Sequence, residues 1–368
     1  NMGLITSIWV NEDNPDNIYA GSNSGGLFVT NNNGQNWQCL TDKYLINGIE
    51  SIDIHKNRPG VIYIGTGTET FGRACGFGVW KSTDNGLTWN ETGLNSQTFT
   101  GNFFTKTAQD PVNPDRLYAI VNFENTSTPS KILRTTNGGN SWEINYSIAP
   151  FLREIEIDKS NPAKVYASGS GLYFSSNYGA SWNDITHKIV PDINNYKVIR
   201  ASVAINPFNS QRILVLRQVK RLDNNEISSG IMLSVDGGNT FTLQSLVNVD
   251  NSYLQFFTMH AGNWMMELEW SKEIMDHFYI GGLWIHKYKL TSNNQFERVR
   301  IAGDVISWNA SYDDLYHIDT RELKTYLIDG VGYIYNGNDG GITKGTEIAN
   351  GNVEWQDISK SGLNITQY

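Results

Sequence analysis

An eight-residue pattern recurs five times along the 368-residue chain. It reads Ser or Thr, any residue, Asp or Asn, any residue, Gly, any residue, Ser, Thr or Asn, and then Trp or Phe. The copies cover residues 30–37, 82–89, 135–142, 175–182 and 234–241. Five matches to a pattern with five specified positions are far beyond chance, so the chain is an array of repeats rather than a series of unrelated elements.

Two degenerate copies keep the aromatic residue but lack the glycine, at Phe296 and Trp355. A second marker precedes the aromatic residue of each copy, which we call its anchor. It consists of a turn, most often with Asn-Pro, followed by a short segment that usually contains Tyr. Examples are residues 14–21, 110–119 and 161–167. Proline ends the strand before it because it cannot donate to a ladder. The aromatic anchors follow one another at a mean spacing of 53 residues, and they are Trp37, Trp89, Trp142, Trp182, Phe241, Phe296 and Trp355.

A repeat of this length is close to the size of a four-stranded sheet with its loops. Radial repetition of such sheets is typical of β-propellers, which have about 4–8 blades. Because each blade packs only on its neighbours, one domain of this kind can exceed the usual size limit. We predict an all-β, seven-bladed β-propeller of four-stranded antiparallel blades in a single domain, 1–368, with blades at roughly 4–45, 46–95, 100–147, 150–190, 196–246, 252–300 and 304–360.

The recurring pattern has a structural interpretation. Its Asp or Asn sits in a hairpin turn and can accept bonds from backbone N–H groups two residues on. Its Gly supplies a positive φ, and its aromatic residue can wedge between neighbouring sheets. We therefore interpret Asp84 and Asp236 as turn residues rather than catalytic acids. The residues assigned to these turns are Asn32, Gly34, Trp37, Asp84, Gly86, Trp89, Asn137, Gly139, Trp142, Asn177, Gly179, Trp182, Asp236, Gly238 and Phe241.

Composition excludes several classes of function. With 28 Lys and Arg against 37 Asp and Glu, the net charge is −9, which disfavours binding to nucleic acid. No segment approaches the ~20 apolar residues of a membrane span, so direct membrane insertion is not expected. Neither a zinc-like His/Cys spacing nor a glycine-rich phosphate loop is found, and we predict no metal and no cofactor. Cys39 and Cys75 are too few for a disulfide framework, and one bridge or two unpaired thiols both fit the count.

The chain begins at Asn1 without a signal-peptide pattern, so we expect that any export signal has been removed and that the sequence is a processed product or a fragment. Several segments carry a resemblance: IYAGSNSGGL at 18–27, GTG at 65–67, GVWKS at 78–82, GNDGGI at 337–342 and GLNITQY at 362–368. With the turn pattern, they make the chain similar to the Asp-box (BNR) propellers, which include sialidases, two-propeller xyloglucan hydrolases and sortilin-type receptors.

The likeness is closer to large Bacteroidetes surface proteins that carry a C-terminal type IX secretion sorting domain. This resemblance implies an exported protein, extracellular or at the bacterial cell surface, that continues beyond residue 368. The family also has a His/Asp cluster before its last unit, which here reads His317, Asp319 and Arg321. Arg321 replaces the final His of that cluster, which argues against a shared metal or acid–base role.

Polar residues on the innermost strands of the last two predicted blades are the candidates for a site. Alternation places Glu267 and Glu269 on one face of a strand, and His317, Asp319 and Arg321 on one face of the next. Paired carboxylates about 5–10 Å apart are what glycoside hydrolysis needs, so Glu267, Glu269 and Asp319 are candidate catalytic acids, although none is assigned. The alternative is a salt-bridged, solvated channel wall.

Further candidates for ligand binding are His260, Trp264, His317, Arg321 and Arg73. Trp264 could stack on a sugar, or it could be a buried core residue. Arg73 lies in a long loop, 68–76, of the second blade, and long loops in compact domains are often functional.

These features favour a non-catalytic recognition or structural module for glycans or for a surface protein partner. One alternative is a glycoside hydrolase of the two-propeller xyloglucanase-like type that uses paired carboxylates. Another is a subunit of a type IX secretion or gliding assembly.

Overall fold

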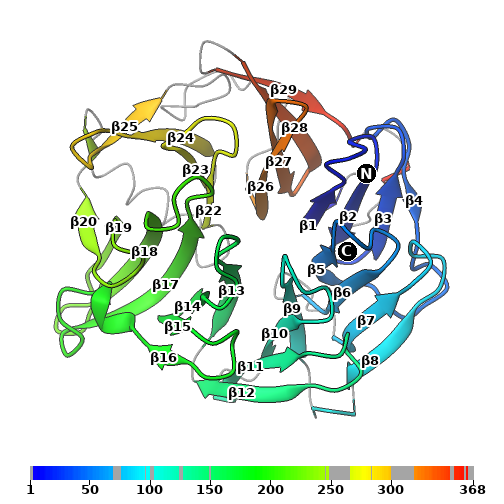
Figure 1. Cartoon of the computed structure of the whole chain (residues 1–368), viewed down its shortest axis with the longest axis horizontal. Coiled ribbons are helices and arrows are strands. Elements are labelled where there is room, and N and C mark those ends of the chain that lie inside the picture. Colours follow the sequence, from blue (N-terminus) through cyan, green and yellow to red (C-terminus); the bar gives the residue numbers. More distant parts are fainter. Residues whose placement is uncertain are drawn as a thin grey trace. The chain divides into compact units, whose positions relative to one another are not determined.

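The computed structural model describes residues 3–68, 76–95, 97–99, 103–123, 127–148, 151–244, 246–247, 266–282, 284–299, 319–348, 352–359 and 362–363. These residues form seven β-sheets, and a single 3-10 helix, Thr186–Lys188, is the helical element among them. The fold class is that of a β-propeller with seven blades of four antiparallel strands, which confirms the predicted fold (Figure 1). The chain divides into two compact units, 1–184 with 360–368 and 185–359.

The first unit contains four sheets, each with its strands in sequence order. The first two are β1 (Ile5–Val10), β2 (Ile18–Ser22), β3 (Leu27–Thr30) and β4 (Gln38–Cys39), then β5 (Ile49–Ile54), β6 (Ile62–Thr66), β7 (Gly78–Ser82) and β8 (Asn90–Asn95). The third and fourth are β9 (Phe103–Gln109), β10 (Leu117–Phe123), β11 (Ser130–Thr135) and β12 (Glu143–Ile148), then β13 (Leu152–Ile157), β14 (Val165–Gly169), β15 (Leu172–Ser175) and β16 (Asn183–Asp184).

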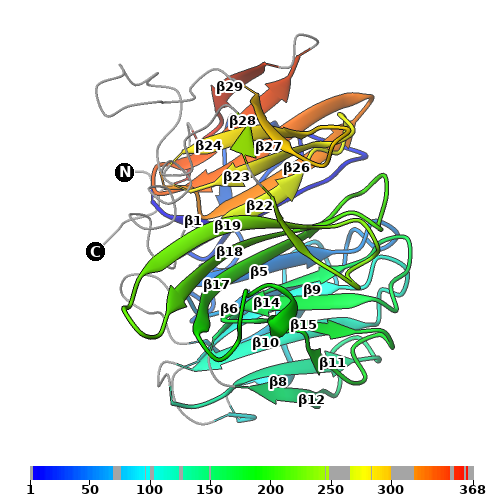
Figure 2. The ribbon, with the colours of Figure 1, turned by 90° about the vertical axis from the view of Figure 1, so that its left-hand side faces the viewer.

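The second unit contains three sheets, whose long strands are seen in Figure 2. The fifth sheet is β17 (Tyr196–Ile205), β18 (Ile213–Arg221), β19 (Ile227–Ser234) and β20 (Thr242–Gln244). The sixth is β21 (Leu246–Val247), β22 (Glu267–Trp270), β23 (His277–Gly281), β24 (Ile285–Leu290) and β25 (Phe296–Val299). The seventh is β26 (Glu322–Ile328), β27 (Val331–Asn338), β28 (Gly341–Glu347) and β29 (Val353–Asp357).

The sixth sheet has one strand more than the four predicted for a blade. Strand β21 pairs in parallel with the outer edge of β25, with Leu246 opposite Phe296. An outermost strand exposes a row of unpaired N–H and C=O groups, and β21 covers part of that row. A two-residue strand has too short a pattern to be predicted from its sequence.

The five repeated turns share one hydrogen-bond scheme. In the second sheet, the Ser82 hydroxyl accepts the Gly86 N–H at 2.8 Å and donates to Asp84 Oδ1 at 2.8 Å, while the Thr88 N–H donates to the same Oδ1 at 2.9 Å. The carboxylate therefore reaches an N–H four residues on, not two as expected. The bond between residues two apart is made by the Ser82 hydroxyl instead, because the N–H of Asp84 donates to Ser82 Oγ. Gly86 has φ +87°, a backbone conformation that is strained in residues with a side chain.

The aromatic anchors Trp89, Trp142 and Trp182 lie against the preceding sheet. Trp89 is buried with Tyr19 and Val29 of the first sheet and with Ile62 of its own sheet. Its indole N–H also donates to Gly86 O at 3.0 Å, so the Trp89 side chain is fixed to the turn that precedes it. Among the degenerate copies, Phe296 is fully buried at the start of β25, whereas Trp355 lies in the middle of β29 and is half-buried.

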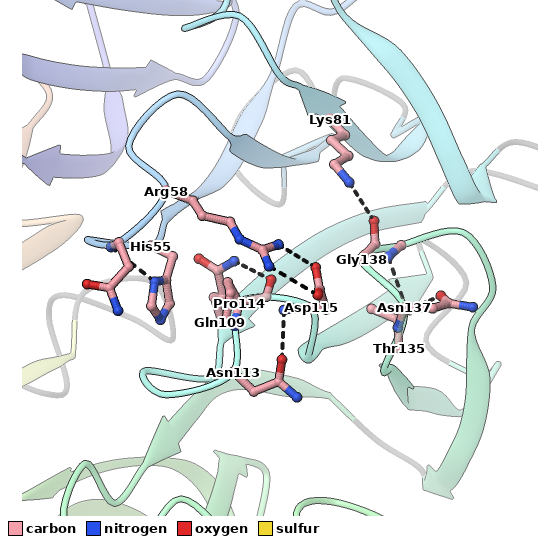
Figure 3. Close-up of polar contacts among 12 residues, drawn as sticks. His55, Arg58, Lys81, Gln109, Asn113, Pro114, Asp115, Thr135, Asn137 and Gly138 are labelled. Atoms are coloured by element: carbon pink, nitrogen blue, oxygen red, sulfur yellow. Dashed lines mark hydrogen bonds and ion pairs between the residues drawn. The ribbon is translucent and has the colours of Figure 1, made fainter.

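Polar contacts cross the seam between the second and third sheets (Figure 3). Arg58 pairs with Asp115 at 2.6 Å, and the Lys81 ammonium donates to Gly138 O at 3.1 Å. The Tyr63 hydroxyl donates to the same carbonyl at 3.1 Å, and its burial raises the pKa of Tyr63 to about 12. These bonds fasten the turns of one blade to the next.

Candidate functional site

Four of the predicted site residues lie outside the described residues: Arg73, His260, Trp264 and His317. The others, Glu267, Glu269, Asp319 and Arg321, belong to the second unit, at or next to the first strands of the sixth and seventh sheets. The geometry of these four can be built from the fifth, sixth and seventh sheets alone.

Glu267, the first residue of β22, is buried and faces an arginine of the fifth sheet. Its Oε1 lies 3.7 Å from Arg200 Nη2 on β17, and the same nitrogen donates to Met266 O at 3.1 Å. Arg200 is 3% exposed, so its charge has been withdrawn from water and needs a nearby carboxylate. The Glu267–Arg200 pair therefore joins β22 to β17.

Glu269, two residues further along β22, contacts the seventh sheet instead. Its Oε1 accepts bonds from the N–H and the hydroxyl of Thr325 on β26, at 3.4 and 3.3 Å. The same hydroxyl lies 2.6 Å from Trp270 O, and Lys272 Nζ lies 3.8 Å from the carboxylate. The two glutamates that alternation places on one face thus interact with different neighbouring sheets.

Arg321, the residue before β26, forms a bidentate ion pair. Its Nε and Nη2 donate to the two oxygens of Asp339, at 2.9 and 3.3 Å. Asp339 lies in the turn between β27 and β28, within the GNDGGI segment that the sequence analysis used only as a resemblance. Asp319 has φ +75°, a conformation that Asp adopts more readily than most residues, and it also has an interaction partner.

A second buried ionic group in this unit was not predicted from the sequence. Lys287 of β24 is fully buried and donates to Glu347 of β28 at 2.9 Å; the hydroxyls of Tyr279 and Ser271 donate to the same carboxylate. Burial and then the Glu347 charge raise the pKa of Tyr279 far above its usual range, so the phenol keeps its proton. Alternation gives no signal for this burial, because Lys287 shares its face of β24 with Ile285 and with the exposed Lys289.

The described glutamates and arginines of the predicted site are held by partners from neighbouring strands. Among the residues that the structure describes, no group of three or more His, Cys, Asp and Glu side chains could hold a metal ion. Within the same residues, no helix has the length and apolar character needed to cross a membrane.

Comparisons with known proteins agree with the fold. No protein-family model matches the chain. A xyloglucanase from Paenibacillus sp is 25% identical over 201 residues, which are 50% of this chain but 14% of that protein. The chain thus spans about one seventh of the length of this curated relative.

Solved structures with the same fold have little sequence in common with the chain. An ancestral GH74 enzyme matches with a TM-score of 0.71 and 16% identity, over 97% of this chain and 46% of that one. The BP39L lectin from Burkholderia pseudomallei matches with a TM-score of 0.58 and 9% identity, over 97% and 99%. YCF48 from Cyanidioschyzon merolae matches with a TM-score of 0.55 and 12% identity, over 93% and 94%.

Proposed function

We propose that this chain is an exported propeller, extracellular or at the cell surface, that recognises a neutral glycan without cleaving it. The observation that carries this proposal is the divergence of the two β22 carboxylates, since Glu267 pairs with Arg200 and Glu269 accepts bonds from Thr325. We also propose that the five turns are Asp-boxes, in keeping with their shared hydrogen bonds.

Glycoside hydrolysis needs two carboxyl groups on either side of one bond, and one of them must hold a proton near neutral pH. A carboxylate beside a buried guanidinium favours its ionised form. Glu267 Oε1 lies 3.7 Å from Arg200 Nη2, so this carboxylate is already engaged in an ion pair within the protein. The separate contacts of Glu267 and Glu269 support a non-catalytic module.

Two observations support a neutral glycan as the ligand class. The relative with 25% identity is a xyloglucanase, and xyloglucan is an uncharged polysaccharide. The net charge of −9 disfavours polyanionic ligands.

The same relative favours a second candidate function. Because half of the chain aligns with a xyloglucanase, the chain could contribute one carboxylate-bearing half of a hydrolase. In that case Glu267 or Glu269 would act on the substrate.

The test combines binding and cleavage with the purified chain. Xyloglucan binding is measured by affinity electrophoresis, and cleavage by release of reducing sugar, for the unmodified chain and for Glu267→Gln and Glu269→Gln. Glu354→Gln, at an exposed position of β29, is the matched control. We expect all four proteins to bind alike and none to release sugar.

Cleavage that falls by about a hundredfold or more in either β22 variant, but not in the control, would replace our proposal with the hydrolase. Absence of binding to xyloglucan and to other neutral polysaccharides would overturn glycan recognition.

A further inference from the structure

We propose that the end of the seam between the sixth and seventh sheets binds the hydroxyl groups of one neutral sugar unit. The site consists of Thr320, Arg321, Asn336, Asn338 and Asp339, which we call the Arg321 cluster. This inference rests on the proposed function and names where the glycan is held.

The backbone brings the members of the Arg321 cluster together. Strands β26 and β27 pair up to Glu322 and Gly337, and one further step of the same register places Arg321 opposite Asn338. The Arg321 N–H donates to Gly337 O at 2.8 Å, which holds this step in place. From the other side, the Thr320 N–H donates to Gly282 O at 2.8 Å, so the end of β23 borders the cluster.

Four polar atoms of the cluster are buried and have no hydrogen-bond partner among the residues that the structure describes: Thr320 Oγ1, Arg321 Nη1, Asn336 Oδ1 and Asn338 Nδ2. The exposed fractions of Thr320, Asn336 and Asn338 are 1%, 0% and 1%, and that of the Arg321 side chain is 7%. Buried polar groups are nearly always bonded, because water cannot compensate them. Four such atoms in one cluster indicate a group that binds there.

The chemistry of the four atoms selects the ligand. Arg321 Nη1 and Asn338 Nδ2 donate, Asn336 Oδ1 accepts, and Thr320 Oγ1 can do both. Sugar hydroxyls likewise donate and accept, so they match this mixed set. The charge of Arg321 is already balanced by Asp339, and Glu322 next to it is buried as well. An anionic ligand would therefore meet no unbalanced positive charge.

The turn that borders the cluster is partly exposed. Asp339 and Gly340 in the β27–β28 turn are half-buried, whereas the Arg321 side chain is 7% exposed. The glycan would enter past this turn and place its hydroxyls on the buried atoms.

Two nearly isosteric substitutions test the site. Thr320→Val removes a hydroxyl that bonds to no protein atom, so the Tm should not fall. Asn338→Asp keeps the Oδ1 that accepts the Gly340 N–H at 2.8 Å and removes the donor. Thr325→Val is the matched control, because this hydroxyl bonds to Trp270 O and Glu269; it should lower the Tm and leave binding unchanged.

Binding of a xyloglucan heptasaccharide to the whole chain is measured by isothermal titration calorimetry. We expect Thr320→Val and Asn338→Asp each to raise the Kd by about tenfold or more, as for a lost ligand hydrogen bond. If the unmodified chain binds and both variants bind equally well, the atoms hold only buried water and this inference fails, while glycan recognition stands. If the unmodified chain binds neither this probe nor any neutral polysaccharide, both proposals fail.

Discussion

Asp84 and Asp236 occupy the turn position that Asn32, Asn137 and Asn177 occupy in the other complete copies. All five side chains accept the same two bonds, from a hydroxyl two residues before and from an N–H four residues after. Hydrogen bonds from Thr88 lower the pKa of Asp84 to about 2. For Asp236, desolvation raises the pKa, but bonds from Thr240 and Ser234 outweigh it and hold the pKa at about 2.

These pKa values predict how stability depends on pH. Both folded-state pKa values lie below the ordinary value of 3.8 for Asp, so the stabilisation is complete above about pH 4 and is lost as the pH falls through 2. The double variant Asp84→Asn/Asp236→Asn should keep the bonds and lose this part of the acid sensitivity. Urea midpoints at pH 6, 4 and 2.5 check it, and Asn137→Asp should add the same sensitivity. If the urea midpoint of the double variant falls as much between pH 4 and pH 2.5 as that of the unmodified chain, Asp84 and Asp236 do not cause this acid sensitivity.

At the scale of strands and sheets, glycines let neighbouring blades approach. Gly65 ends the Tyr-x-Gly segment of β6, and a Cβ there would lie 2.0 Å from Thr105 O on β9. Gly21 and Gly281 hold equivalent places, where a Cβ would lie 2.6 Å from Ile49 and Thr320 side-chain atoms. A backbone oxygen cannot rotate away as a side chain can, so the seam at Gly65 admits no side chain.

Gly65→Ala should therefore lower the free energy of unfolding by about 1–3 kcal/mol or more, as overpacked cores do. Gly60→Ala, in the turn between β5 and β6, is the control, because its Cβ would meet Asn85 at 3.5 Å, an ordinary contact, and the cost should stay within about 0.5 kcal/mol. Urea denaturation of both variants gives the comparison. Equal costs at the two positions would refute the close-approach argument.

For the molecule as a whole, the excess of acidic residues sets its long-range electrostatics. A net charge of −9 repels polyanions, and a neutral glycan releases no counter-ions when it binds. We therefore expect the chain to pass through heparin and duplex-DNA columns at low salt, on which a basic protein is retained. Xyloglucan affinity should change less than about twofold between 50 and 200 mM salt. Retention that weakens steeply with salt would point to a phosphate or sulfate ligand instead.

Sequence alone determined the all-β propeller class, the count of seven blades and the residues of the turns. All of these depend on local patterns: each turn closes within eight residues, and the anchors follow one another at intervals of 40–59 residues. Even the degenerate copies at Phe296 and Trp355 could be found from that spacing. Local hydrogen bonds and strand alternation are properties of short segments, so they can be predicted without knowledge of the rest of the chain.

The partners of the charged side chains were decided only by the tertiary structure. Thr325 meets Glu269 across 56 residues of sequence, and Lys287 meets Glu347 across 60. Alternation predicts on which face of a strand a side chain lies, but not which neighbouring sheet a long side chain contacts. For that reason Glu267 and Glu269 were predicted as a pair and yet contact different sheets, and the bond between Arg321 and Asp339 had no sequence signal.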